Sequence, residues 1–146
     1  MKIFLDTNII MDFLVREGRP NYVASSRILY EATGNPEVAT YCSVQSITDC
    51  AYYFTKKGVT DVHLFIERIK NLLTFIRVKS PSEQLVYETL THAFPDFEDE
   101  MLLRCAIEND CAYFITGDQK ILDNQPFPSL IKSIHPADFL AKAAKQ

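Results

Sequence analysis

The sequence predicts an α/β domain with an open, mainly parallel sheet and helices on both of its faces. Short apolar runs alternate along the chain with segments whose apolar residues recur at helical spacing. The 146 residues contain no internal repeat and no linker-like stretch. This length is usual for one domain, so residues 1–146 are expected to form a single unit.

The strands are expected at short apolar runs that end in polar or turn-forming residues. These runs cover residues 3–5, 38–41, 75–78, 112–115 and 130–134. The first run leads into Asp6-Thr7-Asn8 and the fourth into Thr116-Gly117-Asp118. Right-handed crossovers would place the carboxyl ends of parallel strands on one edge of the sheet, where such folds bind ligands.

Helices are expected between these runs, placed by apolar spacing and by capping residues. A helix with apolar residues at positions 9, 10, 13 and 14 is followed by one from about Tyr22 to Ala32, which Gly34 stops. The third starts after Ser43 or Ser46 and ends at Gly58, and the fourth starts at Thr60 or Asp61. Others run from Ser80-Pro81 to about Leu90, with Pro81 in the first turn, from Asp96 to about Asn109, and from about Ala137. A short helical turn follows Asp118.

Composition limits the function. A net charge of −4 argues against bulk attraction to nucleic acid, but a carboxylate cluster becomes locally positive once it holds metal. No apolar run is long enough to cross a membrane, and the amino terminus lacks a signal-peptide pattern, so a cytoplasmic location is expected. The four cysteines lack zinc-ligand spacing and are expected to be reduced and buried.

Three aspartates follow predicted elements in a way that suggests a shared site. Asp6 and Asp118 come directly after strands and are expected at the ligand-binding edge. Asp99 is in register with the apolar residues Leu102, Leu103 and Ala106 of its helix, and a buried carboxylate there needs a partner. Each has an ordinary alternative: Asp6 as a helix cap, Asp118 as a turn residue, and Asp99 in a capping arrangement with Asp96.

Converging carboxylates suit a hard divalent cation. Mg²⁺ or Mn²⁺ prefers oxygen ligands, and the bound ion can activate water for phosphodiester hydrolysis. No general-base histidine is then required, and His63, His92 and His135 show no catalytic arrangement.

The segments 2–10, 96–107 and 113–118 resemble, in order and spacing, the acidic motifs of PIN domains. The resemblance implies a three-layer α/β/α sandwich with a central, mainly parallel sheet and a metal site. Asp6, Asp99 and Asp118 match the first, third and fourth acids as metal ligands. Asp49 is nearest to the second acid, usually a glutamate, although its helical position points away from the apolar stripe. Asn8 and Thr116 match polar positions that line the cleft.

The same resemblance implies a metal-dependent endoribonuclease with Asp6, Asp49, Asp99 and Asp118 as its catalytic residues. Many small PIN proteins are VapC-like toxins that cleave RNA, bind a small antitoxin and form homodimers. The shorter side chain at Asp49 also fits a catalytically weak PIN scaffold.

Two other acidic α/β classes fit poorly. A haloacid-dehalogenase phosphatase needs an aspartate where Asn8 stands, and a receiver domain needs an acid pair after its first strand. Basic residues that can contact RNA phosphates or instead lie solvated are Arg16, Arg19, Lys56, Lys57 and Lys120. Tyr52 and Tyr53 can stack on bases or pack in the protein.

Overall fold

The computed structural model describes residues 1–56, 61–92 and 96–144. Five parallel strands form one sheet in the order β3-β2-β1-β4-β5. Their bounds are β1 (Lys2–Leu5), β2 (Ala39–Ser43), β3 (Arg77–Lys79), β4 (Tyr113–Ile115) and β5 (Lys132–Ile134). The predicted parallel sheet is thereby confirmed.

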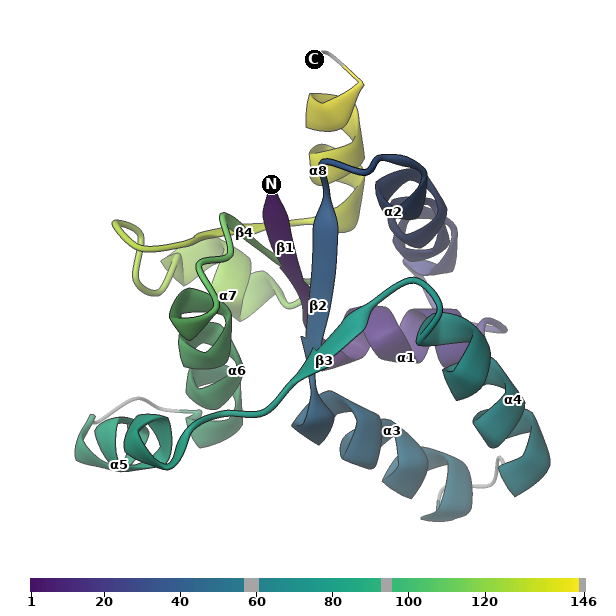
Figure 1. Ribbon diagram of the computed structural model, residues 1–146, viewed down its shortest axis with the longest axis horizontal. Helices are drawn as coiled ribbons and strands as arrows, with labels where there is room; N and C mark the ends of the chain where they lie inside the picture. The colour runs from purple at the N-terminus through teal and green to yellow at the C-terminus, as the bar shows by residue number, and fades with distance from the viewer. Residues whose placement is uncertain (57–60, 93–95, 145–146) are drawn as a thin grey trace.

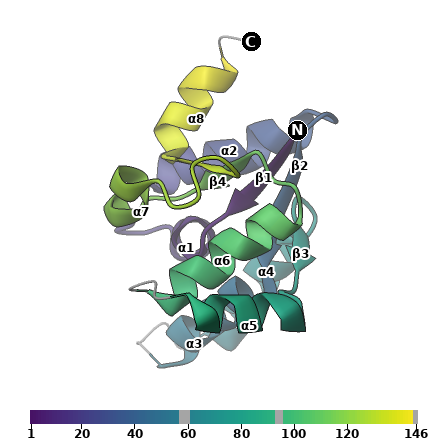
Figure 2. The ribbon, with the colours of Figure 1, turned by 90° about the vertical axis from the view of Figure 1, so that its left-hand side faces the viewer.

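Eight helices connect or follow the strands in the described parts of the chain. They are α1 (Thr7–Val15), α2 (Tyr22–Gly34), α3 (Val44–Lys56), α4 (Val62–Leu72), α5 (Glu83–Thr91), α6 (Phe97–Glu108), α7 (Gln119–Asn124) and α8 (Pro136–Ala143). Figure 1 shows α5, α6 and α7 on one side of the strands and α1, α2, α3 and α4 on the other. Figure 2, turned by 90°, has α5 and α6 in front of the sheet.

Each face of the sheet has its own apolar core because side chains alternate along a strand. Ile3 and Leu5 of β1 belong to the core beneath α1 to α4 and α8. Phe4 points to the opposite face, where its ring stacks on Phe114 of β4 at 6.1 Å between centroids and packs with α6. The three-layer architecture therefore follows from two buried faces.

Several predicted boundaries differ from the structure. Ser82 caps α5 and accepts from the Leu85 N–H, so Pro81 lies before the helix and its placement in the first turn was wrong. Phe75 and Ile76 precede β3, because their N–H groups both donate to the carbonyl of Leu72 at the end of α4. Asp61 caps α4, as one of the two predicted starts, whereas Gly58 and Thr60 lie outside the described residues.

All four cysteines are free and buried, as predicted. None of the described helices combines the length and apolar character that a membrane span requires.

Candidate functional site

The candidate site lies at the carboxyl ends of β1 and β4, which are neighbours in the centre of the sheet. Asp6 directly follows β1, and Thr116-Gly117-Asp118 directly follows β4. The backbone also joins the two turns, since the Asp6 N–H donates to the Ile115 carbonyl at 3.0 Å. The parallel sheet thus brings together residues 110 positions apart.

Asp6 is buried, with 4% of its surface exposed, and both of its carboxylate oxygens accept hydrogen bonds. Oδ1 accepts from the Thr7 N–H at 2.6 Å, and Oδ2 accepts from the Thr116 hydroxyl at 2.6 Å and the Asn8 amide at 2.5 Å. Asp6 is also the N-cap of α1. The capping and binding interpretations of Asp6 are therefore compatible.

Asn8 and Thr116 hold the two turns together. The Asn8 amide also donates to the Thr116 hydroxyl at 3.2 Å, while Asn8 Oδ1 accepts from the Gly117 N–H at 2.9 Å. The Asp118 N–H donates to Thr116 Oγ1 at 2.9 Å. These contacts orient Asp6 and Asp118, as outer partners orient metal ligands in proteins.

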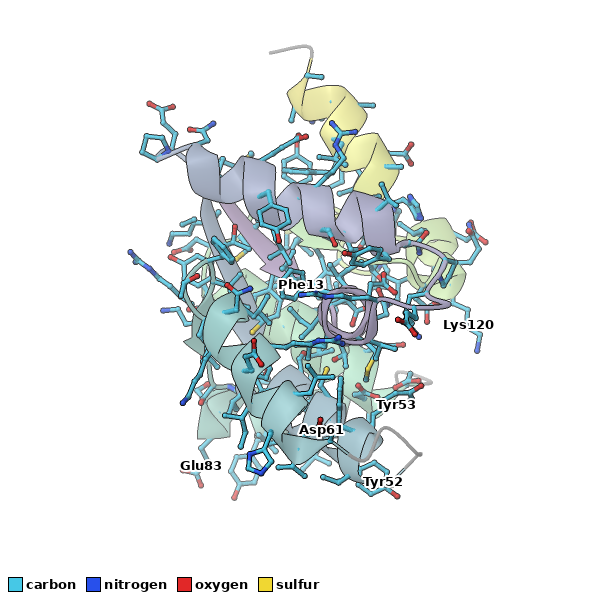
Figure 3. All side chains as sticks on the ribbon, turned by 90° about the vertical axis from the view of Figure 1, so that its right-hand side faces the viewer. Phe13, Tyr52, Tyr53, Asp61, Glu83 and Lys120 are labelled. Atoms are coloured by element: carbon cyan, nitrogen blue, oxygen red, sulfur yellow. The ribbon has the colours of Figure 1, made fainter. Side chains whose placement is uncertain are left out.

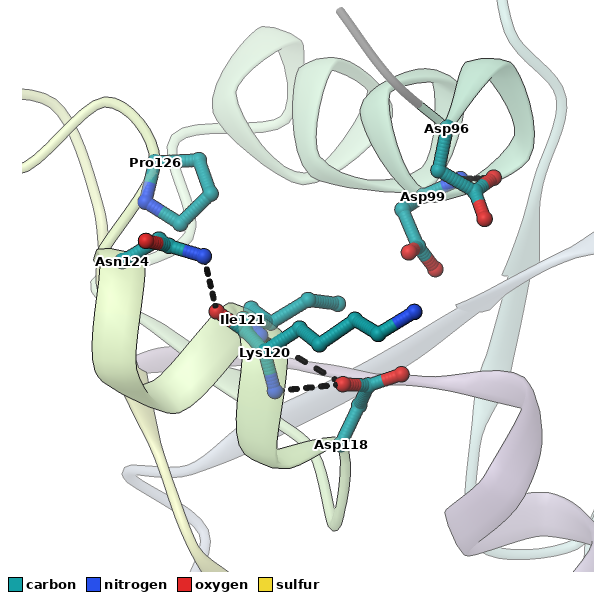
Figure 4. Close-up of a pocket in the computed structure, with 7 residues that line it drawn as sticks. All are labelled: Asp96, Asp99, Asp118, Lys120, Ile121, Asn124 and Pro126. Carbon is teal, nitrogen blue, oxygen red and sulfur yellow. Dashed lines mark hydrogen bonds between the residues drawn. The ribbon is translucent and has the colours of Figure 1, made fainter.

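Asp99 and Asp118 face each other across a pocket of about 350 Å³. Asp118 caps α7 and accepts from the Lys120 N–H at 2.7 Å, and Asp99 lies in the first turn of α6. Figure 4 shows the Lys120 side chain extending between these two carboxylates. Asp96 caps α6 as predicted, but Asp99 points into the pocket and is half-buried.

Asp49 lies on α3 and meets Glu98, the first acid of α6, at hydrogen-bonding range. Asp49 is half-buried and does not lie free at the surface, because the polar side of α3 faces the start of α6. Sequence reasoning missed Glu98. Its signal was the acidic run 98–100: successive helix positions differ by about 100°, so three acids in a row point in three directions.

Burial raises the pKa of Asp6, Asp49, Glu98 and Asp99, and neighbouring charges add to this effect at Asp6, Glu98 and Asp99. Burial is the main cause that raises the pKa of Asp6 to about 7, and the charges of Asp99 and Glu98 contribute. Burial, then Asp96 and Asp118, raise the pKa of Asp99 to about 6, while Lys120 opposes the shift. The pKa values of Asp49 and Glu98 are raised too, first by burial. Repelling carboxylates of this kind are stabilised by a cation.

The donor set fits a hard divalent cation that keeps much of its water. In the described residues, no three Asp, Glu, His or Cys side chains converge closely enough to enclose an ion. Mg²⁺ commonly binds through one or two carboxylates and several waters. Asp99 and Asp118, on opposite walls of an open pocket, and Asp6, whose charge is unfavourable in its buried position, suit that mode.

The other residues named from the sequence have varied surroundings. Arg19 is no solvated surface charge, because its guanidinium donates to the buried Asp12 at 2.8 Å. Arg16 donates to the Phe13 carbonyl and lies over the Phe13 ring. Lys57 and the side chain of Lys56 lie outside the described parts.

The aromatic and imidazole side chains named from the sequence lie in different surroundings as well. Tyr53 packs against the core, whereas Tyr52 is exposed, and both lie on the side of the molecule that carries Lys120 (Figure 3). His135 caps α8, accepting from the Ala137 N–H. His63 and His92 are exposed, and His92 lies 3.6 Å from Glu100.

Three solved structures share this fold over nearly their whole length. VapBC2 from Rickettsia felis, bound to a promoter DNA fragment, is 14% identical, with a TM-score of 0.67 and coverage of 92% of this chain and 98% of the other. The sarcin-ricin-loop-cleaving toxin VapC20 of Mycobacterium tuberculosis is 14% identical, with a TM-score of 0.66 and coverage of 86% and 95%. PAE2754 of Pyrobaculum aerophilum is 12% identical, with a TM-score of 0.65 and coverage of 100% and 97%.

At these identities the likeness establishes the fold alone. Comparison with curated protein sequences gives no match. The family model of the PIN domain, however, matches residues 2–120, which contain β1 to β4 and all four candidate aspartates. This chain therefore belongs to the PIN-domain family.

Proposed function

We propose that this protein is a divalent-metal-dependent endoribonuclease, with Asp6, Asp99 and Asp118 as its metal-binding residues. The observation that carries the proposal is the buried Asp6, whose carboxylate is held by Asn8 and Thr116 and repelled by the acids of α6. Members of the PIN family with nuclease activity generally use divalent ions, and Mg²⁺ or Mn²⁺ suits these carboxylates.

A bound divalent ion would supply an activated water and neutralise charge on the phosphodiester. The chain's own residues prepare the site for this reaction. Asn8 and Thr116 fix the Asp6 carboxylate, and Lys120 lines the pocket with a positive charge that would attract a phosphate. Glu98 reaches Asp49, and we assign the pair Asp49–Glu98 to the role of the family's second acid.

The test is cleavage of a fluorescently labelled single-stranded RNA and a labelled hairpin by the purified protein. We expect cleavage with Mn²⁺ or Mg²⁺, none with EDTA, and loss in Asp6→Asn and Asp99→Asn. Asp110→Asn is the matched control, because Asp110 is an exposed carboxylate just before β4, at the opposite edge of the sheet. Absence of metal-dependent cleavage at high protein concentration would contradict the proposal and favour the catalytically weak scaffold.

The toxin role, with a small antitoxin partner and a homodimer in the cytoplasm, is the narrower form of this proposal. The fold shared with the VapBC2 complex favours it. Growth arrest upon expression, relieved by Asp6→Asn, supports the toxin; unimpaired growth together with RNA cleavage in vitro supports a housekeeping enzyme.

A further inference from the structure

A second pocket, of about 490 Å³, lies between α2 and α8 beside the acidic site. Its wall includes Asn21, which precedes α2, and His135, which follows β5. Two observations connect this pocket to the candidate site at the carboxyl edge of the sheet. The Thr116 N–H donates to the carbonyl of Ile134, the neighbour of His135, at 3.1 Å, and the Asn21 amide lies against Gly117.

Gly117 and Asn21 fit together closely. A Cβ at position 117 would lie 2.8 Å from Asn21 Nδ2 and 3.4 Å from Asn8 Oδ1. Because the Gly117 N–H is bound to Asn8, the backbone there has little freedom to move away. The missing side chain at position 117 therefore makes room for the Asn21 amide between the acidic site and the second pocket.

The loop that carries Asn21 is held by buried charge. Arg19 donates to Asp12, which is 2% exposed, and to the Asn8 carbonyl at 3.4 Å, while the Ser25 hydroxyl donates to the other Asp12 oxygen at 2.9 Å. No hydrogen bond to the Asn21 side chain is present within the described residues. Its amide is thus a donor that is available to a ligand.

Each of the polar side chains that line the second pocket, those of Asn21, Arg27 and His135, can donate a hydrogen bond, although the Asn21 amide also carries an acceptor oxygen. His135 Nδ1 accepts from the Ala137 N–H at 3.3 Å, so a neutral imidazole must carry its hydrogen on Nε2. Arg27 adds a guanidinium, although Glu31 binds it at 2.7 Å. Val23, Ala24 and Leu140 supply an apolar surface. Donors around an apolar wall suit an acceptor-rich ligand with a flat apolar part.

We propose that this pocket is a subsite for one nucleotide of the RNA, next to the scissile phosphodiester, with Asn21, Arg27 and His135 binding its phosphate. This inference rests on the proposed ribonuclease function. The volume of the pocket is within the range of pockets that hold small ligands. The RNA would then run along the carboxyl edge of the sheet, from the Lys120 side to the groove between α2 and α8.

The test compares a short single-stranded RNA with bis-p-nitrophenyl phosphate, a phosphodiester that has no flanking nucleotide. Arg27→Gln and His135→Asn are expected to raise KM for the RNA roughly tenfold, the scale of one charge-assisted hydrogen bond, and to leave hydrolysis of the small diester unchanged. Asparagine at 135 keeps the cap of α8 and removes the imidazole N–H. Arg27→Gln should also lower the slope of log KM against log salt by about 0.7.

Two further variants make the test sharper. Glu31→Gln should lower KM for the RNA, because Arg27 loses its competing partner. Gly117→Ala should displace the Asn21 amide and raise KM as Asn21→Ala does, and the double variant should match Asn21→Ala alone because the clash is gone.

The outcomes separate the two proposals. Cleavage whose KM is the same in Arg27→Gln, His135→Asn and wild type overturns the subsite and leaves a protein partner as the occupant of the pocket. No cleavage of either substrate, with RNA binding that still weakens in Arg27→Gln by fluorescence anisotropy, overturns the nuclease and supports the subsite.

Discussion

Single residues at the site serve structural and binding roles at once. Asp6 caps α1, and its side chain is held by Thr116 and Asn8 in a buried position that disfavours its negative charge. A carboxylate with these contacts stays in place without a cation, but it is more stable when a cation is near. The local hydrogen bonds therefore fix the geometry, and the surrounding charge favours a metal.

Asp6 also predicts how stability depends on pH. The pKa of this carboxyl rises from 3.8 to about 7 on folding, so the folded protein binds the proton more tightly than the unfolded chain. In EDTA, the Asp6 contribution to the free energy of unfolding should fall as pH rises from about 4 to about 7. Urea unfolding at pH 5 and pH 8 measures it. Equal pH dependence in wild type and Asp6→Asn would contradict the burial argument.

Thr116 predicts an effect on metal affinity. Thr116→Val keeps the shape of the buried side chain and removes the hydroxyl that binds Asp6 and the Asp118 N–H. Partners of metal ligands typically contribute 10- to 100-fold, so we expect Mn²⁺ affinity to fall roughly tenfold or more. Isothermal titration with Mn²⁺ measures it, and Thr40→Val is the control, because Thr40 is a buried threonine of β2 without a hydrogen-bond partner for its hydroxyl. The idea fails if both variants bind Mn²⁺ as wild type does.

At the scale of elements, the first turn of α6 distributes three acids. Glu98 meets Asp49 of α3, Asp99 lines the pocket, and Glu100 is fully buried against Arg104, 2.6 Å away. Helical geometry imposes this divergence, since neighbouring positions point about 100° apart. The first turn of α6 thereby contacts α3 through Glu98, faces the pocket through Asp99 and forms an ion pair within α6 through Glu100.

This arrangement predicts that Glu98 contributes to activity. Glu98→Gln keeps the size of the side chain and removes a charge beside Asp49 and Asp6. If the pair Asp49–Glu98 replaces the family's second acid, kcat for RNA should fall by roughly tenfold or more. Glu108→Gln, an exposed glutamate at the other end of α6, is the matched control. Unchanged kcat in Glu98→Gln would show that Glu98 is only a neighbour of the site.

The connection between α1 and α2 depends on one ion pair. Removing Arg19 leaves Asp12 charged and 2% exposed, whereas removing Asp12 leaves an arginine that is 30% exposed and can reach water. We therefore expect Arg19→Met to lower the free energy of unfolding by about 3 kcal/mol or more, and Asp12→Asn by less. Urea denaturation of both variants measures the difference. A larger loss of unfolding free energy in Asp12→Asn than in Arg19→Met would show that the hydrogen bond from Ser25 is enough to stabilise the buried Asp12 carboxylate.

At the scale of the molecule, the strand order creates the site. β1 and β4 are neighbours although the chain visits β2 and β3 between them, so the turns after β1 and β4 meet. Helices on both faces bury Ile3, Phe4 and Leu5 completely, which makes the centre of the sheet a rigid base for these turns.

Because the centre of the sheet supports these turns, we expect the stability of the fold to be sensitive to the loss of a side chain there. Phe114 is fully buried and stacks on Phe4 beneath α6, so Phe114→Ala should cost about 3–5 kcal/mol of unfolding free energy. Tyr87→Ala, an aromatic side chain that is 60% exposed on α5, should cost much less. Thermal unfolding followed by circular dichroism compares them. Similar losses in the two variants would contradict the proposed role of the sheet's centre.

The strands, most helix boundaries and the positions of Asp6 and Asp118 could be predicted from the sequence, because short-range patterns govern them. Apolar runs mark buried parallel strands, and Asp96 and Asp61 reveal helix starts through local capping. The error at Pro81 was local as well: Ser82 is the better cap, so the helix begins at Glu83, two residues after Pro81.

Only the tertiary structure decided which polar groups meet across elements. The Asp49–Glu98 contact depends on how α3 and α6 are placed on the two sides of the sheet, and the fit of Asn21 against Gly117 depends on a loop held by Asp12 and Arg19. No pattern of a few residues carries this information, because interhelical placement results from packing over both faces of the sheet. The sequence by itself determined the fold class and the acids at the strand ends; the packing determined their partners.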